Sequence, residues 1–154
     1  MFCDCSSLKS LDLSNFNTKT VKDMNSMFSG CSDLTYLNVS SFDSSKVTDM
    51  SKMFENCQNI INFDLKNFDT REVECMANMF RNCSKAEIID VSNFITSKVE
   101  DMALMFAECQ SLTNLIINNF DTSRVTDMYS MFRNCESLTS LNLNNFDTSR
   151  VNDM

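Results

Sequence analysis

The stretch Val47-Thr48-Asp49-Met50-Ser51-Lys52-Met53-Phe54-Glu55-Asn56-Cys57 decides the fold, because versions of it recur along the whole chain. The same pattern occupies residues 21–31, 73–83, 99–109 and 125–135, each 26 residues after the one before. A period of this length is typical of solenoid proteins, in which every repeat forms one coil and stacks on its neighbours.

The apolar residues confirm that the repeat extends over the whole chain. All 12 methionines and 12 of the 13 phenylalanines fall in the same few columns when the sequence is written in rows of 26. The exception is Phe63, which stands in a column that otherwise holds leucine or isoleucine. Chance placement would not produce this order, so the chain is a single repeat array over residues 1–154.

Each repeat has two halves with different hydrophobic periods. Around Leu37 and Val39, apolar and polar residues alternate, which predicts a short half-buried β-strand. From Val47 to Cys57 the apolar residues are three, three, one and three positions apart, which predicts a short helix with Thr48 as its N-cap and Asp49 in its first turn. The predicted fold class is therefore an α/β solenoid of about six leucine-rich-repeat-like coils, each with one parallel strand and one short helix.

The two ends of the sequence fall inside a repeat. Met1, Phe2 and Cys5 occupy the columns of Met27, Phe28 and Cys31, and Met154 occupies the column of Met128. We therefore expect an array that is truncated in mid-repeat at both ends. Repeat arrays need polar capping repeats for solubility, so we also expect self-association through the uncapped ends.

Composition excludes several classes of protein. A formal net charge of -8 argues against binding to nucleic acid or to an anionic membrane surface. No apolar run approaches the ~20 residues that a membrane-spanning helix needs. The N-terminal residues have neither the basic nor the apolar region of a signal peptide, and no membrane anchor is recognisable in the sequence.

A catalytic or cofactor site has no support in the sequence. The chain contains no histidine, no nucleophile motif and no glycine-rich phosphate loop, so we expect a protein that is not an enzyme and has no cofactor. The aspartate column that includes Asp49 resembles calcium-binding turns only weakly, since the chain has a single glycine, and a favourable charge at a helix start explains it better. We predict no metal site.

Six of the eight cysteines form one column, and stacked coils would place them above one another. The favoured interpretation is a ladder of small buried thiols, because free cysteine is among the most buried residues. Disulfides between adjacent coils are the alternative, because stacked Cα atoms can fall within bonding range. The ladder consists of Cys5, Cys31, Cys57, Cys83, Cys109 and Cys135.

The segment from Asn119 to Leu138 closely resembles the repeat of BspA-like leucine-rich-repeat surface proteins. The shared motif, NFDTSxVTDMxxMFxxCxxL, is long and recurs over the whole chain; the fourth repeat departs from it most, with Ala86 and Ile95 in place of the usual residues. The resemblance implies an extracellular or cell-surface location and a non-enzymatic role in adhesion.

The best candidate for a binding surface is the outward face of the predicted strands. Solenoids often bind partners, here a protein or a glycan, on an extended face of this kind. The expected function is a non-catalytic cell-surface module that mediates adhesion or protein binding there; the alternative is a structural spacer or an intracellular scaffold. The candidate site residues are Tyr36, Asn38, Asn62, Asp64, Ile88, Asp90, Asn114, Ile116 and Asn142.

Overall fold

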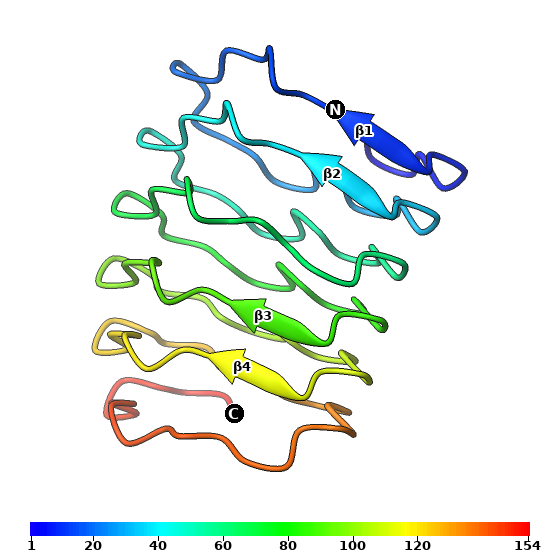
Figure 1. The fold of residues 1–154 in the computed structure, drawn as a ribbon. Helices are drawn as coiled ribbons and strands as arrows, with labels where there is room; N and C mark the ends of the chain where they lie inside the picture. The colour runs from blue at the N-terminus through cyan, green and yellow to red at the C-terminus, as the bar shows by residue number, and fades with distance from the viewer.

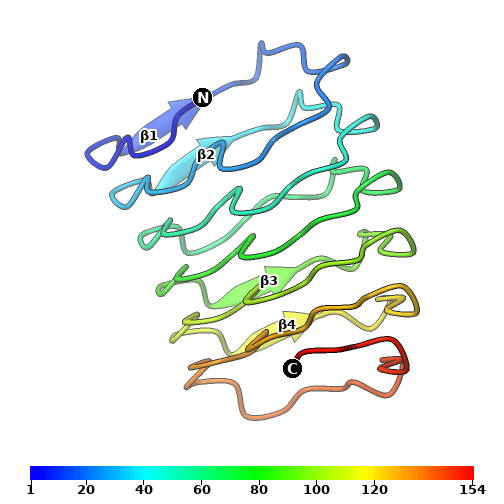
Figure 2. The same cartoon turned by 180° about the vertical axis from the view of Figure 1, so that it is seen from behind.

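The computed structural model describes residues 1–154 as one stack of coils, wound in sequence order from the N-terminus to the C-terminus (Figure 1). Each coil has a front run that carries the strands, a rear run, and a turn at either edge that joins them (Figures 1 and 2). The predicted solenoid is confirmed, although a strand is assigned in only four of its coils. No helix in the structure is long and apolar enough to cross a membrane.

Four strands are regular enough to be assigned: β1 (Ser10–Asp12), β2 (Tyr36–Asn38), β3 (Ile88–Asp90) and β4 (Asn114–Ile116). β1 pairs in parallel with β2, and β3 with β4, so equivalent residues of successive coils lie side by side. The in-register pairs are Leu11 with Leu37 and Ile89 with Leu115, whose side chains enter the core. The repeat period therefore sets the register directly.

The rear run carries a second ladder that joins all the coils. Parallel bridges connect Asp23 to Asp49, Asp49 to Cys75, Cys75 to Asp101, and so on to Asp153. From each bridge onward, every second backbone N–H donates to the next coil, as Met50 does to Cys75 and Phe54 does to Met79. The N–H groups in between bond within their own coil, as Met53 does to Met50.

This alternation replaces the predicted helix, which is wrong. Residues 47–57 form consecutive turns, and Lys52 and Asn56 have φ angles of 57° and 59°, in the left-handed region that a right-handed helix cannot contain. Each lies at the third position of a turn closed by a bond between residues i and i+3, which is the geometry of a type II turn. Turns form here because they direct every second N–H group toward a backbone carbonyl of the next coil, which accepts its hydrogen bond.

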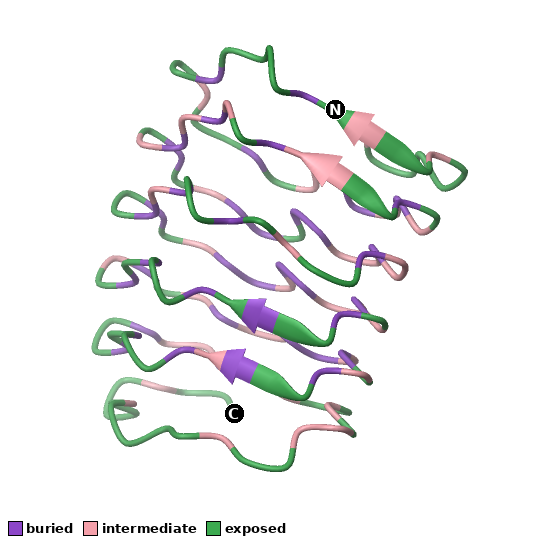
Figure 3. Cartoon of the chain, viewed as in Figure 1, coloured by how far each residue is buried: buried purple, intermediate pink, exposed green.

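The apolar columns meet in a continuous core between the front and rear runs. The rings of Phe28, Phe54, Phe80 and Phe106 are fully buried and stack with centroids 5.6–5.7 Å apart, nearly parallel. Figure 3 shows that burial is greatest in the middle coils and least in the last one, because a coil at the end has only one neighbour. The stacking that the sequence predicted is confirmed, although the segment between the stacked residues is not helical.

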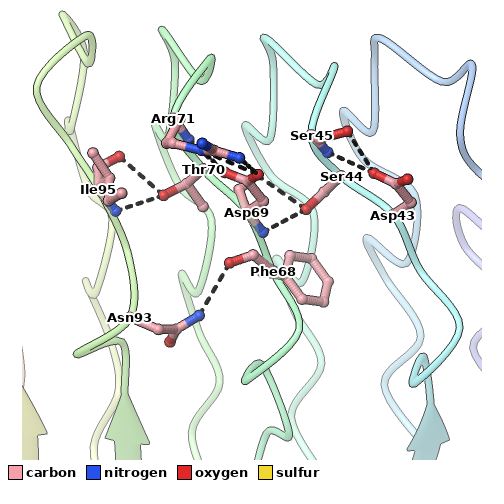
Figure 4. Close-up of polar contacts among 9 residues, drawn as sticks. All are labelled: Asp43, Ser44, Ser45, Phe68, Asp69, Thr70, Arg71, Asn93 and Ile95. Atoms are coloured by element: carbon pink, nitrogen blue, oxygen red, sulfur yellow. Dashed lines mark hydrogen bonds and ion pairs between the residues drawn. The ribbon is translucent and has the colours of Figure 1, made fainter.

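Buried hydroxyl groups tie the coils together at the edge turn (Figure 4). Thr70 donates to the carbonyl of Ile95 at 2.9 Å and accepts from the N–H of the same residue at 2.8 Å. Ser44 forms the same pair of bonds with Asp69 in the next coil. One side chain thus replaces two backbone ladder bonds at a point where the chain turns too sharply to pair directly.

Candidate binding face

The strand face consists of the side chains that alternate with the core along the front run. Seven of the nine candidate site residues are exposed there, and Asn38 and Ile116 are half-buried. Tyr36 and Asn38 lie on β2, Ile88 and Asp90 on β3, and Asn114 and Ile116 on β4. The structure therefore gathers the candidates on one face, in the order of their coils.

Outside the four strands, the remaining candidates lie on less regular backbone. Asn62 forms an isolated bridge with Ile88, whereas Asp64 and Asn142 lie outside every strand. The strand face is therefore continuous as a surface, but its hydrogen-bonded ladder is not.

Several polar side chains on this face also stabilise turns. The side-chain oxygens of Asn38, Asp90 and Asn142 each accept the backbone N–H two residues further on, at 3.0–3.1 Å. Hydrogen bonds from the hydroxyl and the N–H of Ser92 lower the pKa of Asp90 below its usual value. This Asx-turn role is missing from the sequence prediction, although asparagine and aspartate two residues before serine or asparagine signal it.

Asp64 is the exception among the polar residues of its column. It accepts no hydrogen bond from residue 66 and forms no ion pair, so its exposed carboxylate has no partner. The exposed apolar residues of the face are Tyr36, with 53% of its surface accessible, and Ile88, with 44%. No hydrogen bond or ion pair within the chain engages the side chains of Asp64, Tyr36 and Ile88.

The aspartate column of the rear run has the same structural role. Asp49 accepts the N–H of Ser51 at 2.8 Å, and Asp127 accepts that of Tyr129 at 2.8 Å. The expected role as a charge at a helix start is wrong, because no helix begins there. No group of three or more acidic or cysteine side chains is arranged to hold a metal ion.

The cysteine column is a ladder of free thiols. Cys31, Cys57, Cys83 and Cys109 are fully buried, and all eight cysteines are free. Each Sγ donates to a phenylalanine carbonyl of the preceding coil, as Cys83 does to Phe54 at 3.2 Å. Burial raises the pKa of Cys109 to about 12 and that of Cys83 well above its usual value. The disulfide alternative is not adopted.

Exposed ion pairs link some coils at the edges. Lys98 pairs with Glu72 at 2.6 Å and Arg124 with Glu100 at 2.7 Å, and each pair spans neighbouring coils. Pairs of this exposure contribute little to stability. Lys98 and Arg124 occupy the same column of the repeat.

A family model covers the whole chain. Residues 1–88 and 76–154 both match DUF285, described as a Mycoplasma protein of unknown function. The chain belongs to the DUF285 family. No curated protein matches the sequence.

Solved structures show the same fold for this DUF285 chain. A leucine-rich repeat protein from Bacteroides ovatus ATCC 8483 superposes over 88% of the chain with a TM-score of 0.56 and 18% identity. A leucine-rich repeat protein from T. pallidum matches 89% of this chain and 68% of its own, with a TM-score of 0.44 and 16% identity. The DUF285 chain spans 31% of the length of the B. ovatus protein. The likeness to the B. ovatus protein supports a leucine-rich-repeat fold.

Proposed function

We propose that this DUF285 chain is a non-catalytic binding module that recognises a protein partner through the strand face. The observation that carries the proposal is a contrast between two faces. Along the rear run, every second backbone N–H bonds to the next coil and the aspartate column stabilises turns within each coil. On the strand face, the exposed column changes from coil to coil, as Ser10, Tyr36, Asn62, Ile88, Asn114 and Ser140.

The exposed residues of this column suit protein recognition. Tyr36 and Ile88 leave about half of their surfaces in water, and tyrosine and isoleucine bury well against a partner. The surrounding amides of Asn62 and Asn114 supply hydrogen-bonding groups without a desolvated charge. A face of this composition resembles the polar rim and apolar centres of protein interfaces.

We further propose that the module acts at the cell surface in adhesion, as the resemblance of its repeat to BspA-like proteins supports. The competing proposal, a spacer or an intracellular scaffold, makes the opposite prediction about location. Labelling of intact cells that express the native gene, with a membrane-impermeant biotin reagent, distinguishes the two. A protein that is labelled only after lysis would contradict the surface role.

Binding is tested with two matched triple variants. Tyr36→Ser, Ile88→Ser and Ile116→Ser remove the apolar side chains of the strand face, whereas Tyr129→Ser, Ile95→Ser and Ile61→Ser remove exposed apolar side chains outside the nine candidate positions. We expect binding to extracellular-matrix proteins, measured by surface plasmon resonance, to be lost in the first variant and kept in the second. Equal loss in both, or no loss in the first, would contradict the strand face as the site.

A further inference from the structure

The strand-face ladder is interrupted between the second and third coils, and no backbone hydrogen bond joins residues 114–117 to residues 140–143 in the fifth and sixth coils either. In the first coil the N–H of Leu13 donates to Asn38, and in the fourth the N–H of Val91 donates to Ile116. The equivalent N–H of Val39 has no acceptor, and no backbone hydrogen bond joins residues 36–39 to residues 62–65. The rear ladder continues past the same point, through Asp49 and Cys75.

Phe63 distinguishes the core at the first of these two interruptions. It occupies the column of Leu37 and Ile89, and its larger ring packs against Phe54 at 5.1 Å and edge-on against Phe80 at 5.2 Å. Extra volume in a packed core forces the backbone to shift. Phe63 therefore places more side-chain volume in the core between the second and third coils than leucine or isoleucine does in the other coils.

A groove of about 140 Å³ lies on the strand face at this interruption. It is lined by Tyr36, Leu37, Asn38, Val39, Ser40, Asp64 and Asn67. Asn67 is already committed, since its side-chain amide donates to the carbonyl of Ser40 at 2.9 Å. The groups that remain without a partner are the Val39 N–H, the Asp64 carboxylate and the Tyr36 ring.

Charge favours a cationic occupant. The outward positions of the strands carry three acidic residues, Asp12, Asp64 and Asp90, and one basic residue, Lys66. After the hydrogen bonds from Ser92, the charge of Lys66 also lowers the pKa of Asp90. The whole chain has a net charge of -8. An anionic ligand would meet repulsion at this groove, whereas a basic side chain would find an unpaired carboxylate.

We propose that the groove receives an arginine side chain from an extended segment of a protein partner. A guanidinium group donates hydrogen bonds in a plane that suits a carboxylate and stacks on aromatic rings, which matches Asp64 and Tyr36. The backbone of the same segment supplies a carbonyl oxygen for the Val39 N–H, which a free amine or a metal ion would not do. The volume accommodates one side chain.

This inference rests on the proposed function, since it names the chemistry that the strand face would recognise. A peptide probe tests arginine binding in the groove separately from partner binding by the whole strand face. The capped peptide acetyl-Gly-Gly-Arg-Gly-Gly-amide is titrated into isotope-labelled protein, and amide chemical shifts are followed by NMR. We expect saturable shifts centred on Leu37, Val39 and Asp64, and no such shifts with citrulline, which is neutral and nearly isosteric, in place of arginine.

The decisive variant is Asp64→Asn. Asparagine is native to this column at Asn38 and Asn142, and Asp64 makes no structural bond, so the fold should be unaffected. We expect about tenfold weaker binding of the arginine peptide, consistent with loss of a charge-assisted hydrogen bond. Asp12→Asn, in the same column but outside the candidate site, should leave binding unchanged because Asp12 already accepts the N–H of Ser14.

Several outcomes would overturn the proposal. Absence of any saturable shift, equal binding of the citrulline peptide, or unchanged binding in Asp64→Asn would each do so. A lysine peptide that binds as tightly as the arginine peptide would overturn the assignment to a guanidinium group. A further outcome is that the triple variant of Tyr36, Ile88 and Ile116 loses partner binding while the unmodified protein fails to bind the arginine peptide. That result would support the strand face as the binding site and reject the groove as an arginine site.

Discussion

Residues with positive φ are what make the repeat possible. One such column consists of Asp4, Gly30, Asn56, Asn82, Glu108 and Asn134, and a second of Ser26, Lys52, Asn78, Leu104 and Ser130. Glycine, asparagine and aspartate tolerate this conformation best, and they fill most of the first column. The structure requires both columns, because each positive φ turns a peptide group toward the next coil.

Asn78 offers a direct test of this requirement. It has a φ of 58°, lies in the middle of the array and makes no side-chain hydrogen bond. We expect Asn78→Val to reduce the free energy of unfolding by about 1–2 kcal/mol, since a β-branched side chain is strained in this region. Asn78→Gly should be close to neutral. Urea denaturation measures both, and equal loss in the two variants would contradict the explanation by φ.

The thiols are predicted to differ sharply in reactivity. Cys3 and Cys5 are exposed, whereas Cys57, Cys83 and Cys109 are buried and burial raises the pKa of each thiol. Since the thiolate is the reactive form, iodoacetamide at pH 8 should label Cys3 and Cys5 in the native protein and the buried three only in denaturant. Peptide mass spectrometry identifies which cysteines carry the label. Rapid native labelling of Cys83 would contradict the ladder.

At the scale of the element, the sequence predicts which side chains enter the core better than it predicts the backbone between them. The inward positions of Met50, Met53 and Phe54 are as expected. Their spacing fits a helix, but it also fits turns that bring every third residue inward, and hydrophobic period alone does not separate the two. The recurrence of glycine and asparagine just before the cysteine is the sequence feature that favours turns.

The candidate site shows a similar division. Alternation along the strands places Tyr36 and Ile88 outside correctly. The groove beside Asp64 was not predictable, because it lies where hydrogen bonds between two coils fail to form. Such differences arise from packing between coils, which no single repeat contains.

The hydroxyl ladder makes each edge turn dependent on its neighbour. Thr70→Val keeps the shape of the side chain but leaves both the N–H and the carbonyl of Ile95 without their partner. We expect a loss of about 2 kcal/mol or more in the free energy of unfolding, since each buried unpaired group costs roughly 1–3 kcal/mol. Thr70→Ser should lose much less, because Ser44 fills this column natively. Thermal unfolding measures the difference, and equal losses would show that the hydroxyl is dispensable.

At the scale of the whole molecule, Asx turns make the array sensitive to acid. Hydrogen bonds from nearby serine or arginine groups lower the pKa of six aspartates in the folded protein: Asp12, Asp43, Asp69, Asp90, Asp121 and Asp147. A carboxyl group whose pKa is lowered by folding stabilises the fold fully at any pH above its pKa in the unfolded chain, about 3.9. This contribution disappears as the pH falls through the lower pKa of the folded state. Burial raises the pKa of Asp101, so that group acts in the opposite direction.

We therefore expect the thermal midpoint, followed by circular dichroism, to fall below about pH 4. The triple variant Asp43→Asn, Asp121→Asn and Asp147→Asn should show a smaller fall while remaining folded at pH 7. Asn17 fills the same column and accepts the N–H of Lys19 at 3.2 Å, so asparagine preserves the turn. An unchanged acid response in the variant would mean that other groups control it.

The last coil presents an open apolar surface. A cavity of about 370 Å³ there is lined by Met131, Phe132, Leu143 and Phe146 among others, the side chains that an adjoining coil would cover in the middle of the array. We expect the 154-residue chain to self-associate through this surface, because the hydrophobic effect favours any contact that removes it from water. Sedimentation velocity over a range of concentrations measures the association.

Leu143→Lys places a charge on this open surface, and Ile95→Lys places one on an exposed isoleucine at an edge turn of the fourth coil. If the open coil drives association, the first substitution shifts the population toward monomer and the second leaves it unchanged, because only Leu143 lies where another coil would pack. A monomeric parent protein at all concentrations, or association that is equally sensitive to both substitutions, would contradict the end surface as the contact. Since the same columns repeat in every coil, the groups that hold the array together are the ones that its open coil offers to a second molecule.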